Sequence, residues 1–256
     1  MELQDKVAFI TGGASGLGRA TAENFINAGA KVMVFDLNED NAKQTAEELG
    51  ANASFASGDV ADEDAVKAAI DQTVETFGAI HVNLNSAGIG SAARTVGKEG
   101  PMPLKTFEFV VRVNLIGTFN VLRLCAEVMQ NNEPTTDDGE KGVIVNVASV
   151  AAFDGQIGQA AYSASKAGVA GMTLPIARDL SRQGIRVCTI APGIFETPMM
   201  QAAPPQVREP LIEMTQFPKR LGDPPAFAQT VAYLVNCNYI NGETIRLDAG
   251  IRMQPK

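Results

Sequence analysis

Near the start of the chain, an apolar run breaks at a cluster of glycines and gives way to a helical pattern. Val7–Ile10 is apolar throughout, as in a strand that is buried on both faces. Gly12, Gly16 and Gly18 follow, and Arg19–Ile26 then has helical spacing. Glycines allow a tight turn and let backbone N–H groups approach phosphate oxygens, with the helix N-terminus directed at the charge. This order of elements predicts a strand–turn–helix unit that holds a nucleotide.

An acidic residue ends the second predicted strand, Lys31–Asp36. Asp36 lies eighteen residues beyond Gly18, close to the spacing of an acid that binds the ribose of a dinucleotide. The alternative is a turn residue at a strand end, and the glycines favour the cofactor role. Leu37 and Asn38 offer no cation for a 2′-phosphate, and Arg19 is expected to face outward. We therefore expect NAD rather than NADP.

Strand and helix patterns alternate along the chain. The predicted strands are Val7–Ile10, Lys31–Asp36, Ala53–Val60, Val82–Asn85, Val143–Ser149, Ile185–Ile190 and Glu243–Leu247. The predicted helices are Arg19–Ile26, Glu39–Leu49, Ala65–Phe77, Phe107–Met129 and Tyr162–Gln183. Alternation of this kind predicts an α/β fold, a single-domain Rossmann-like doubly wound parallel sheet with helices on both faces.

No repeat or linker divides the chain, so we expect one domain over residues 1–256. Residues from 1 to about 150 form its cofactor half, and the remainder, to 256, form the catalytic and substrate half. Ligands of such sheets bind beyond the carboxyl ends of the strands. Six candidate residues fall at or just after predicted strand ends: Ser15, Asp36, Asp59, Ser86, Ser149 and Pro192.

A tyrosine and a lysine lie four residues apart in the last predicted helix. Tyr162 and Lys166 therefore share one side of the helix, one turn apart. A free phenol has a pKa of about 10, and a neighbouring ammonium favours its ionised form. Ser149 ends a buried strand and can hold a substrate oxygen beside the tyrosine. Taken alone, the pair would more simply be a surface Tyr/Lys pair on an ordinary helix.

Composition narrows the functional classes. The net charge of −8 argues against nucleic acid as the main partner. His81 is the single histidine, so we expect no metal site and a structural role for His81 at a strand edge. Cys125, Cys188 and Cys237 are widely spaced, and we expect them to be reduced and in the core. No stretch of about eighteen apolar residues suggests a membrane span. Because the first strand begins at Lys6-Val7, we expect no signal or transit segment and a cytoplasmic protein.

Five motifs in order resemble the short-chain dehydrogenase/reductase family over essentially the whole chain. They are Thr11-Gly12-x-x-x-Gly16-x-Gly18, Asn85-Ser86-Ala87-Gly88, Asn114, Ser149 with Tyr162-x-x-x-Lys166, and Pro192–Thr197. The second motif departs from the family pattern, which has asparagine where Ser86 stands. The resemblance implies an NAD(P)-dependent oxidoreductase in which Tyr162 is the acid/base.

The resemblance also implies the residues of the site. Catalysis would use Ser149, Tyr162, Lys166 and Asn114, the last to position a proton-relay water. The cofactor would be bound by Gly12, Ser15, Gly16, Leu17, Gly18, Asp36, Asp59, Val60, Asn85, Ser86, Ala87, Gly88, Tyr162, Lys166, Pro192, Gly193, Phe195 and Thr197. The substrate would contact Ser149, Tyr162 and Gln156. For Asp59, the alternative is an acid near a helix N-terminus, because Asp62 and Glu63 follow closely.

A narrower resemblance is to one branch of the family, the type 2 3-hydroxyacyl-CoA dehydrogenases. It rests on Ala148–Tyr162, Met172–Leu180, Phe217–Pro224, Ile245–Pro255 and the insertion Gly90–Leu104. These enzymes interconvert 3-hydroxyacyl-CoA and 3-oxoacyl-CoA with NAD, and some accept hydroxysteroids. The branch implies a homotetramer and an acyl-CoA or other small hydroxy or oxo substrate. Its animal members are mitochondrial, but nothing in this sequence resembles a transit segment, so we expect a cytoplasmic relative, such as a bacterial one.

The sequence is also compatible with two other functions, and two further segments are interpreted from their composition. One alternative is an NADPH-dependent 3-oxoacyl-carrier-protein reductase, and the other is a non-catalytic dinucleotide-binding protein. Pro198–Pro205 is either an adaptable wall over an acyl chain or a surface loop. Asn131–Lys141 is strongly polar, and we expect a solvated loop.

Overall fold

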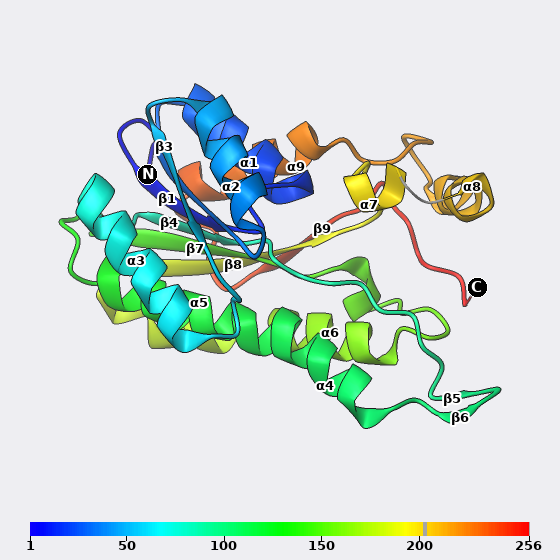
Figure 1. Cartoon of the computed structure of the whole chain (residues 1–256). Helices are drawn as coiled ribbons and strands as arrows, with labels where there is room; N and C mark the ends of the chain where they lie inside the picture. The colour runs from blue at the N-terminus through cyan, green and yellow to red at the C-terminus, as the bar shows by residue number, and fades with distance from the viewer. Residues whose placement is uncertain (202–203, 256) are drawn as a thin grey trace.

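The protein is built on one seven-stranded parallel sheet (Figure 1), here in a computed structural model that describes residues 1–201 and 204–255. Its strands are β1 (Val7–Thr11), β2 (Lys31–Asp36), β3 (Ala53–Ser57), β4 (Val82–Asn85), β7 (Gly142–Val147), β8 (Ile185–Pro192) and β9 (Thr244–Leu247). The order is β3-β2-β1-β4-β7-β8-β9. Successive strands are added on one side of β1 as far as β3, and on its other side from β4 onward. Such folds bind ligands at the point where the strand order reverses in this way.

Helices cover both faces of the sheet (Figure 1). One face carries α1 (Gly16–Asn27), α2 (Glu39–Leu49) and α9 (Pro224–Asn236). The other carries α3 (Glu63–Phe77), α4 (Leu104–Val111), a π-helical turn (Arg112–Gly117), α5 (Thr118–Met129) and α6 (Ala160–Asp179). Beyond the strand ends lie α7 (Pro198–Gln201) and α8 (Pro205–Met214). The predicted doubly wound α/β fold is confirmed.

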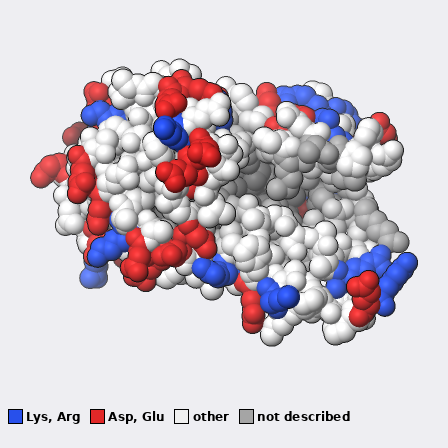
Figure 2. Space-filling model, viewed as in Figure 1, with Lys and Arg blue, Asp and Glu red and all other residues white. Residues whose placement is uncertain are grey.

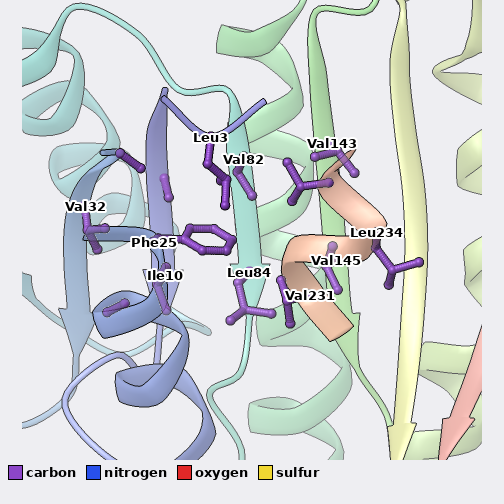
Figure 3. Packing of buried hydrophobic residues seen from close by; sticks show 14 of the residues in the cluster. Leu3, Ile10, Phe25, Val32, Val82, Leu84, Val143, Val145, Val231 and Leu234 are labelled. Carbon is purple, nitrogen blue, oxygen red and sulfur yellow. The ribbon is translucent and has the colours of Figure 1, made fainter. Parts of the chain in front are cut away.

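Side chains that alternate along the strands supply both halves of the core. On β1, Ala8 and Ile10 face α1 and α9, whereas Phe9 faces the opposite helices. Figure 3 shows Phe25 of α1 against the sheet, with Val231 and Leu234 of α9 further along the same face. Strands that are covered on both faces need apolar residues at every position, which explains the continuous apolar runs in the sequence.

The glycine turn after β1 depends on backbone that other residues adopt poorly. Gly12 and Gly16 have φ of 61° and 53°, in the left-handed region. A Cβ on Gly12 would lie 2.9 Å from the Ala87 nitrogen, and one on Gly18 would overlap the Gly12 carbonyl oxygen. Glycine is therefore required at position 12 for the close approach of Ala87, and at position 18 for the packing of α1 on the turn.

Several element bounds differ from the sequence predictions. β3 ends at Ser57 rather than Val60, and the predicted helix Phe107–Met129 begins at Leu104 and contains the π-helical turn. The insertion Gly90–Leu104 forms a hairpin of β5 (Val96–Gly97) and β6 (Gly100–Pro101). The predicted helix Tyr162–Gln183 ends at Asp179 and continues as a 3₁₀ turn, Ser181–Gln183.

The composition of Asn131–Lys141 predicts a solvated loop, but the structure shows that part of this segment is buried. Glu140 is buried and lies 2.7 Å from the guanidinium of Arg186, which is also buried. The same carboxylate accepts a 3.0 Å hydrogen bond from the Met1 amine. Arg186 donates its other hydrogen bonds to three main-chain carbonyls near the end of α9. The segment thus supplies half of a buried ion pair that spans 46 residues of sequence.

The continuous helical stretch Leu104–Met129 is long and apolar enough to cross a membrane by length and composition alone. The sequence predicts a helix over Phe107–Met129 but no candidate membrane span. Its most apolar window has a mean hydropathy of 1.4, and 56% of that window is buried inside the protein. Because α5 packs on the sheet and on α3, burial in the core accounts for its apolar character.

The single histidine accepts a main-chain hydrogen bond, and two of the three cysteines are buried. His81 Nδ1 accepts a 3.2 Å hydrogen bond from the Val7 N–H, and burial, aided by the charge of Lys6, lowers the pKa of His81 to about 4. This confirms the expected structural role at a strand edge. Cys125 and Cys188 are buried, whereas Cys237 is partly exposed.

Candidate active site

A cavity of about 530 Å³ lies beyond the carboxyl ends of the strands, at the point where the strand order reverses. Figure 2 shows the surface hollowed between the part of the molecule that carries α7 and α8 and the part that carries the β5–β6 hairpin. The surface around the hollow is largely uncharged in this view. Its volume falls within the range of about 300–1,000 Å³ typical of small-molecule sites.

Ser149, Tyr162 and Lys166 meet on one wall of this cavity. Ser149 follows β7 and begins the 3₁₀ turn Val150–Ala152, where its Oγ accepts a 3.1 Å hydrogen bond from the Ala151 N–H. Tyr162 and Lys166 lie one turn apart on α6, and the lysine Nζ is 5.9 Å from the centroid of the tyrosine ring. The structure therefore brings together the three side chains that the sequence placed in one site.

The electrostatics of the pair differ from the expectation that the lysine charge lowers the tyrosine pKa. Burial raises the pKa of Tyr162, and hydrogen bonding with the Ser149 hydroxyl opposes the rise. Burial also lowers the pKa of Lys166 to about 8. Desolvation of both groups thus outweighs their mutual interaction in the free protein.

Asn114 lies beside this group but not on the cavity wall. Its Oδ1 accepts a 2.8 Å hydrogen bond from the Ile89 N–H, and its Nδ2 donates to the Ile89 carbonyl and the Ser165 hydroxyl. A Cβ on Gly88 would lie 3.2 Å from Asn114 Oδ1 and 3.4 Å from Lys166 Nζ. Asn114 stands in the π-helical turn, a feature that is frequent at functional sites. Its amide holds the backbone at Ile89, which does line the cavity.

The opposite end of the cavity is lined by the glycine turn and by Asp36. Ser15, Gly16 and Leu17 place the N-terminus of α1 at the wall. The Asp36 carboxylate accepts 3.2 Å hydrogen bonds from the N–H groups of Ala14 and Asn38. These contacts hold the carboxylate at the end of β2.

Arg19, the nearest cation in the sequence, points away from Asp36. Its guanidinium is exposed and pairs with Glu23 at 3.0 Å and Glu48 at 2.6 Å. Of the described residues on the cavity wall, Lys166 alone is a cation, and it stands with Tyr162.

Most of the predicted cofactor residues line the cavity. The structure places there Gly12, Ser15, Gly16, Leu17, Asp36, Asp59, Val60, Ser86, Ala87, Gly88, Pro192, Gly193, Phe195 and Thr197. Asp59 does not cap α3, since that contact belongs to Asp62, which accepts from two N–H groups. Instead, Asp59 lies 3.2 Å from the exposed guanidinium of Arg112.

Besides Asn114, three predicted site residues do not line the cavity. Gly18 is buried against the glycine turn, where it serves packing. Asn85 is buried in the sheet, and its Nδ2 donates hydrogen bonds to the Oδ1 atoms of Asn83 on the same strand and Asn146 on the neighbouring strand β7. Gln156, predicted to contact substrate, donates from Nε2 to the Gln254 carbonyl at 3.0 Å. Gln156 is therefore engaged by the C-terminal segment in this structure.

Sequence reasoning missed much of the apolar wall. The unforeseen lining residues are Phe35, Leu37, Gly58, Ile89, Gly90, Phe109, Val113, Val147, Ala148 and Ile194. Most adjoin a predicted residue in sequence and could have been inferred from it. Phe109 is one turn before Val113, and this i, i+4 apolar pair ahead of Asn114 was an available signal. Of the Pro198–Pro205 segment, which was a candidate acyl wall, Pro198 and Met200 line the cavity. The side chain of Met199 and residues 202 and 203 lie outside the part of the chain that the structure describes.

Within residues 1–201 and 204–255, no group of three or more His, Cys, Asp or Glu side chains could hold a metal ion. The site thus consists of a tyrosine, a lysine and a serine at one end and a carboxylate with a helix N-terminus at the other.

Comparison with known proteins defines the class of this protein. The family model described as short chain dehydrogenase matches residues 6–208. The chain belongs to this family, and it is an oxidoreductase.

Individual relatives show which members of the family this chain is similar to in sequence and structure. The chain is 51% identical over 255 residues to the 3-hydroxyacyl-CoA dehydrogenase type-2 of Drosophila melanogaster, covering 99% of this chain and 100% of that one. It is 52% identical over 251 residues to the Bos taurus protein of the same name, covering 97% and 96%. The crystal structure of 3-hydroxyacyl-CoA dehydrogenase type-2 from Mycobacterium avium superimposes with a TM-score of 0.94 at 41% identity, and covers both chains fully. These findings confirm the resemblance drawn from the sequence motifs.

Proposed function

We propose that this protein interconverts 3-hydroxyacyl-CoA and 3-oxoacyl-CoA with NAD as cofactor. The observation that carries the proposal is one cavity with Ser149, Tyr162 and Lys166 at one end and Asp36 at the other. The names of the similar dehydrogenases support the substrate class. Some hydroxysteroids are candidate second substrates.

The residues present fit a dinucleotide. The N-terminus of α1 opens onto the cavity and offers N–H groups and a partial positive charge to a pyrophosphate. Asp36 can accept hydrogen bonds from both ribose hydroxyls. Because Arg19 is held by two carboxylates, no described cation on that side is free to meet a 2′-phosphate. These features support NAD over NADP.

The side chains of the site divide the chemistry between them. When bound, NAD supplies the hydride acceptor. Ser149 and Tyr162 hold the substrate hydroxyl, and the phenolic oxygen of Tyr162 takes its proton as the carbinol C–H bond breaks. Lys166 stabilises the ionised phenol and holds the cofactor ribose. In the reducing direction, Tyr162 returns the proton to the carbonyl oxygen.

Tyr162 must lose its proton before it can act as a base. Since burial raises its pKa in the free protein, the ionised phenol needs positive charge beside it. Lys166, whose pKa is lowered to about 8, is a source of that charge near neutral pH. Asn114 supports this arrangement by fixing Ile89 at the wall, and we retain it as the residue that positions a proton-relay water.

The substrate side of the cavity is apolar. Phe109, Val113, Ile194 and Met200 line it, and an acyl chain is the part of the substrate that such side chains would bury. We propose that Met200 belongs to this acyl wall, as the composition of Pro198–Pro205 suggested.

The two alternatives make opposite predictions for cofactor and turnover. A 3-oxoacyl-carrier-protein reductase would use NADPH, which the environment of Asp36 disfavours. A non-catalytic dinucleotide-binding protein would bind NADH without turnover, and the assembled Ser149, Tyr162 and Lys166 count against it.

A panel of 3-hydroxyacyl-CoA thioesters and hydroxysteroids, each with NAD and with NADP, ranks the alternatives by kcat/KM. We expect 3-hydroxyacyl-CoA with NAD to rank first. A 3-oxoacyl carrier thioester with NADPH ranking above it would support the carrier-protein reductase. Tight NADH binding without any turnover would support the binding protein.

We also propose that the protein is a cytoplasmic homotetramer. Exposed apolar side chains on α5, on α6 and on the π-helical turn that packs against both support association: Ile116, Phe119 and Leu174 are 53%, 47% and 44% exposed. Light scattering would give the mass of four chains, and Phe119→Asp would lower it. A monomeric mass for the unmutated protein would contradict the proposal.

A further inference from the structure

The loop between the two proton-handling residues is held by the far end of the chain. Ser149 and Tyr162 are separated by residues 150–161, which leave the sheet and return as α6. The Asp154 carboxylate lies 2.6 Å from Arg246 of β9, and the guanidinium carbon stands 5.4 Å from the centroid of the Phe153 ring. Further along, Gln156 Nε2 and the Ile157 N–H each donate a 3.0 Å hydrogen bond, to the Gln254 and Pro255 carbonyls.

Arg246 also contacts residues next to the Pro192-Gly193 segment of the cavity wall. Its Nε donates to the Asp248 carboxylate at 2.7 Å, and its Nη2 donates to the Ile251 carbonyl at 3.0 Å. Asp248 packs on Gly193, since a Cβ on Gly193 would lie 2.9 Å from the Asp248 Cα. The Gly193 N–H in turn donates to the Leu247 carbonyl at 2.9 Å. Gly193 lines the cavity and follows β8, the strand that pairs with β7 ahead of Ser149.

The guanidinium is suited to this position in a way that a lysine is not. Its planar fork offers donors in fixed directions, so one side chain can bind two carboxylates and a carbonyl while stacking on a ring. Arg246 and Asp154 are 22% and 21% exposed, and Asp248 is 9% exposed, so solvent screens the contacts only in part.

We propose that Arg246 is a positioning residue that fixes the Ser149–Tyr162 loop relative to the Pro192–Gly193 wall. Through Asp154 it holds the loop that orients the substrate hydroxyl, and through Asp248 it holds the wall beside the hydride acceptor. Arg246 itself does not line the cavity. The inference rests on the proposed function, since it assigns Arg246 to the geometry of hydride transfer.

Four variants separate positioning from general stability. Arg246→Gln removes the bridge, and Arg246→Lys keeps the charge without the fork. Asp154→Asn removes the negative charge from the contact to the loop and leaves the contact to Asp248 in place. Arg252→Gln is the matched control, because Arg252 lies 3.2 Å from the same Asp248 but is 62% exposed, and its other hydrogen bond goes to the Ile251 carbonyl rather than to Asp154. Each is measured for kcat/KM with 3-hydroxybutyryl-CoA and NAD, for the Kd of NADH, and for the primary deuterium isotope effect.

Arg246→Gln and Asp154→Asn should lower kcat/KM by about tenfold or more, since misplacement of reacting groups by about 1 Å can cost about a hundredfold. The isotope effect should rise in both, because hydride transfer becomes slower relative to the other steps. The Kd of NADH should change by less than about threefold, since the glycine turn and Asp36 lie elsewhere. Arg246→Lys should recover part of the loss, and Arg252→Gln should match the unmutated protein.

Equal kcat/KM for Arg246→Gln and Arg252→Gln would overturn the inference. Parallel losses of turnover and NADH affinity, with an unchanged isotope effect, would also overturn it, because they indicate a loss of folded protein only. If Arg246→Gln does not fold, Asp154→Asn must still lower kcat/KM and raise the isotope effect while the Kd of NADH stays nearly unchanged. An unmutated protein that is inactive on this substrate would contradict the proposed function instead, and the variants are then compared on the panel's best substrate.

Discussion

Lys166 Nζ donates a 2.8 Å hydrogen bond to the main-chain carbonyl of Val147, the last residue of β7. Val147 stands two residues before Ser149, so this bond ties the helix that carries Tyr162 to the strand that presents the serine. The lysine ammonium is thereby held at the cavity wall by the protein itself. Its orientation does not depend on a ligand.

Removing that ammonium should damage two steps at once. Lys166→Ala should lower kcat, because the charge that favours ionised Tyr162 is lost, and weaken NADH binding, because the lysine contacts the ribose. Steady-state kinetics and fluorescence titration with NADH measure the two effects. Loss of turnover with unchanged NADH affinity would show that Lys166 does not contact the ribose of the cofactor.

Cofactor choice should rest on Asp36. At about 4 Å and an effective dielectric near 20, each like-charge pair with a 2′-phosphate costs about 4 kcal/mol before relaxation. Half of that corresponds to about thirtyfold discrimination. We expect NAD to be preferred over NADP by well over tenfold in kcat/KM, and Asp36→Ala to narrow the gap. Comparable efficiencies in the unmutated protein would mean that a cation reaches the phosphate.

The acyl wall should depend on Met200. Met200→Ser replaces an adaptable apolar side chain with a polar one, so KM should rise more for long acyl chains than for acetoacetyl-CoA. Met214→Ser, which changes a partly buried methionine of α8 away from the cavity wall, is the control. Equal effects of Met200→Ser at all chain lengths would exclude Met200 from the acyl site.

The buried pair of Glu140 and Arg186 should contribute strongly to stability. Glu140→Gln leaves a buried guanidinium without its carboxylate, which typically costs about 3–5 kcal/mol. Glu23→Gln breaks an exposed pair with Arg19 and should cost less than about 1 kcal/mol. Urea unfolding of both variants gives the two values. Similar losses would show that Glu140 and Arg186 are not an effective buried pair.

Acid should weaken the fold partly through His81. The unfolded chain binds a proton at this residue below about pH 6.5, whereas the folded protein, with the His81 pKa lowered to about 4, does not. Stability is therefore fully present above about pH 6.5 and falls as the pH drops toward 4. His81→Asn should show a smaller decrease in Tm between about pH 7 and about pH 4.5. An identical decrease in both proteins would contradict the assignment.

Local patterns in the sequence were enough to predict the sheet and much of the site. The bounds of β2, α2 and β4 coincide with the predicted ones, because each segment carries its own periodicity and its own end signals. Asn38, for example, caps α2 through a 2.9 Å hydrogen bond from the Asn41 N–H. The motif residues at strand ends meet in one cavity because parallel strands end at the same edge.

What the sequence did not reveal depends on contacts between distant segments. The partners of Glu140 and Gln156 are Arg186 and Gln254, and no local pattern pairs them. Desolvation of Tyr162 likewise follows from the whole cavity rather than from its one-turn spacing to Lys166. The role of Arg246 was invisible for the same reason.

The most direct test of the account is the turnover of Tyr162→Phe beside its affinity for NADH. The substitution removes one hydroxyl, and with it the proton carrier, while it leaves the ring in place. We predict that turnover of 3-hydroxyacyl-CoA is nearly abolished and that the Kd of NADH stays within about threefold of the unmutated value. If Tyr162→Phe keeps more than about a tenth of the kcat, less than about 1.4 kcal/mol of the barrier depends on the phenol, and the acid/base assignment is wrong.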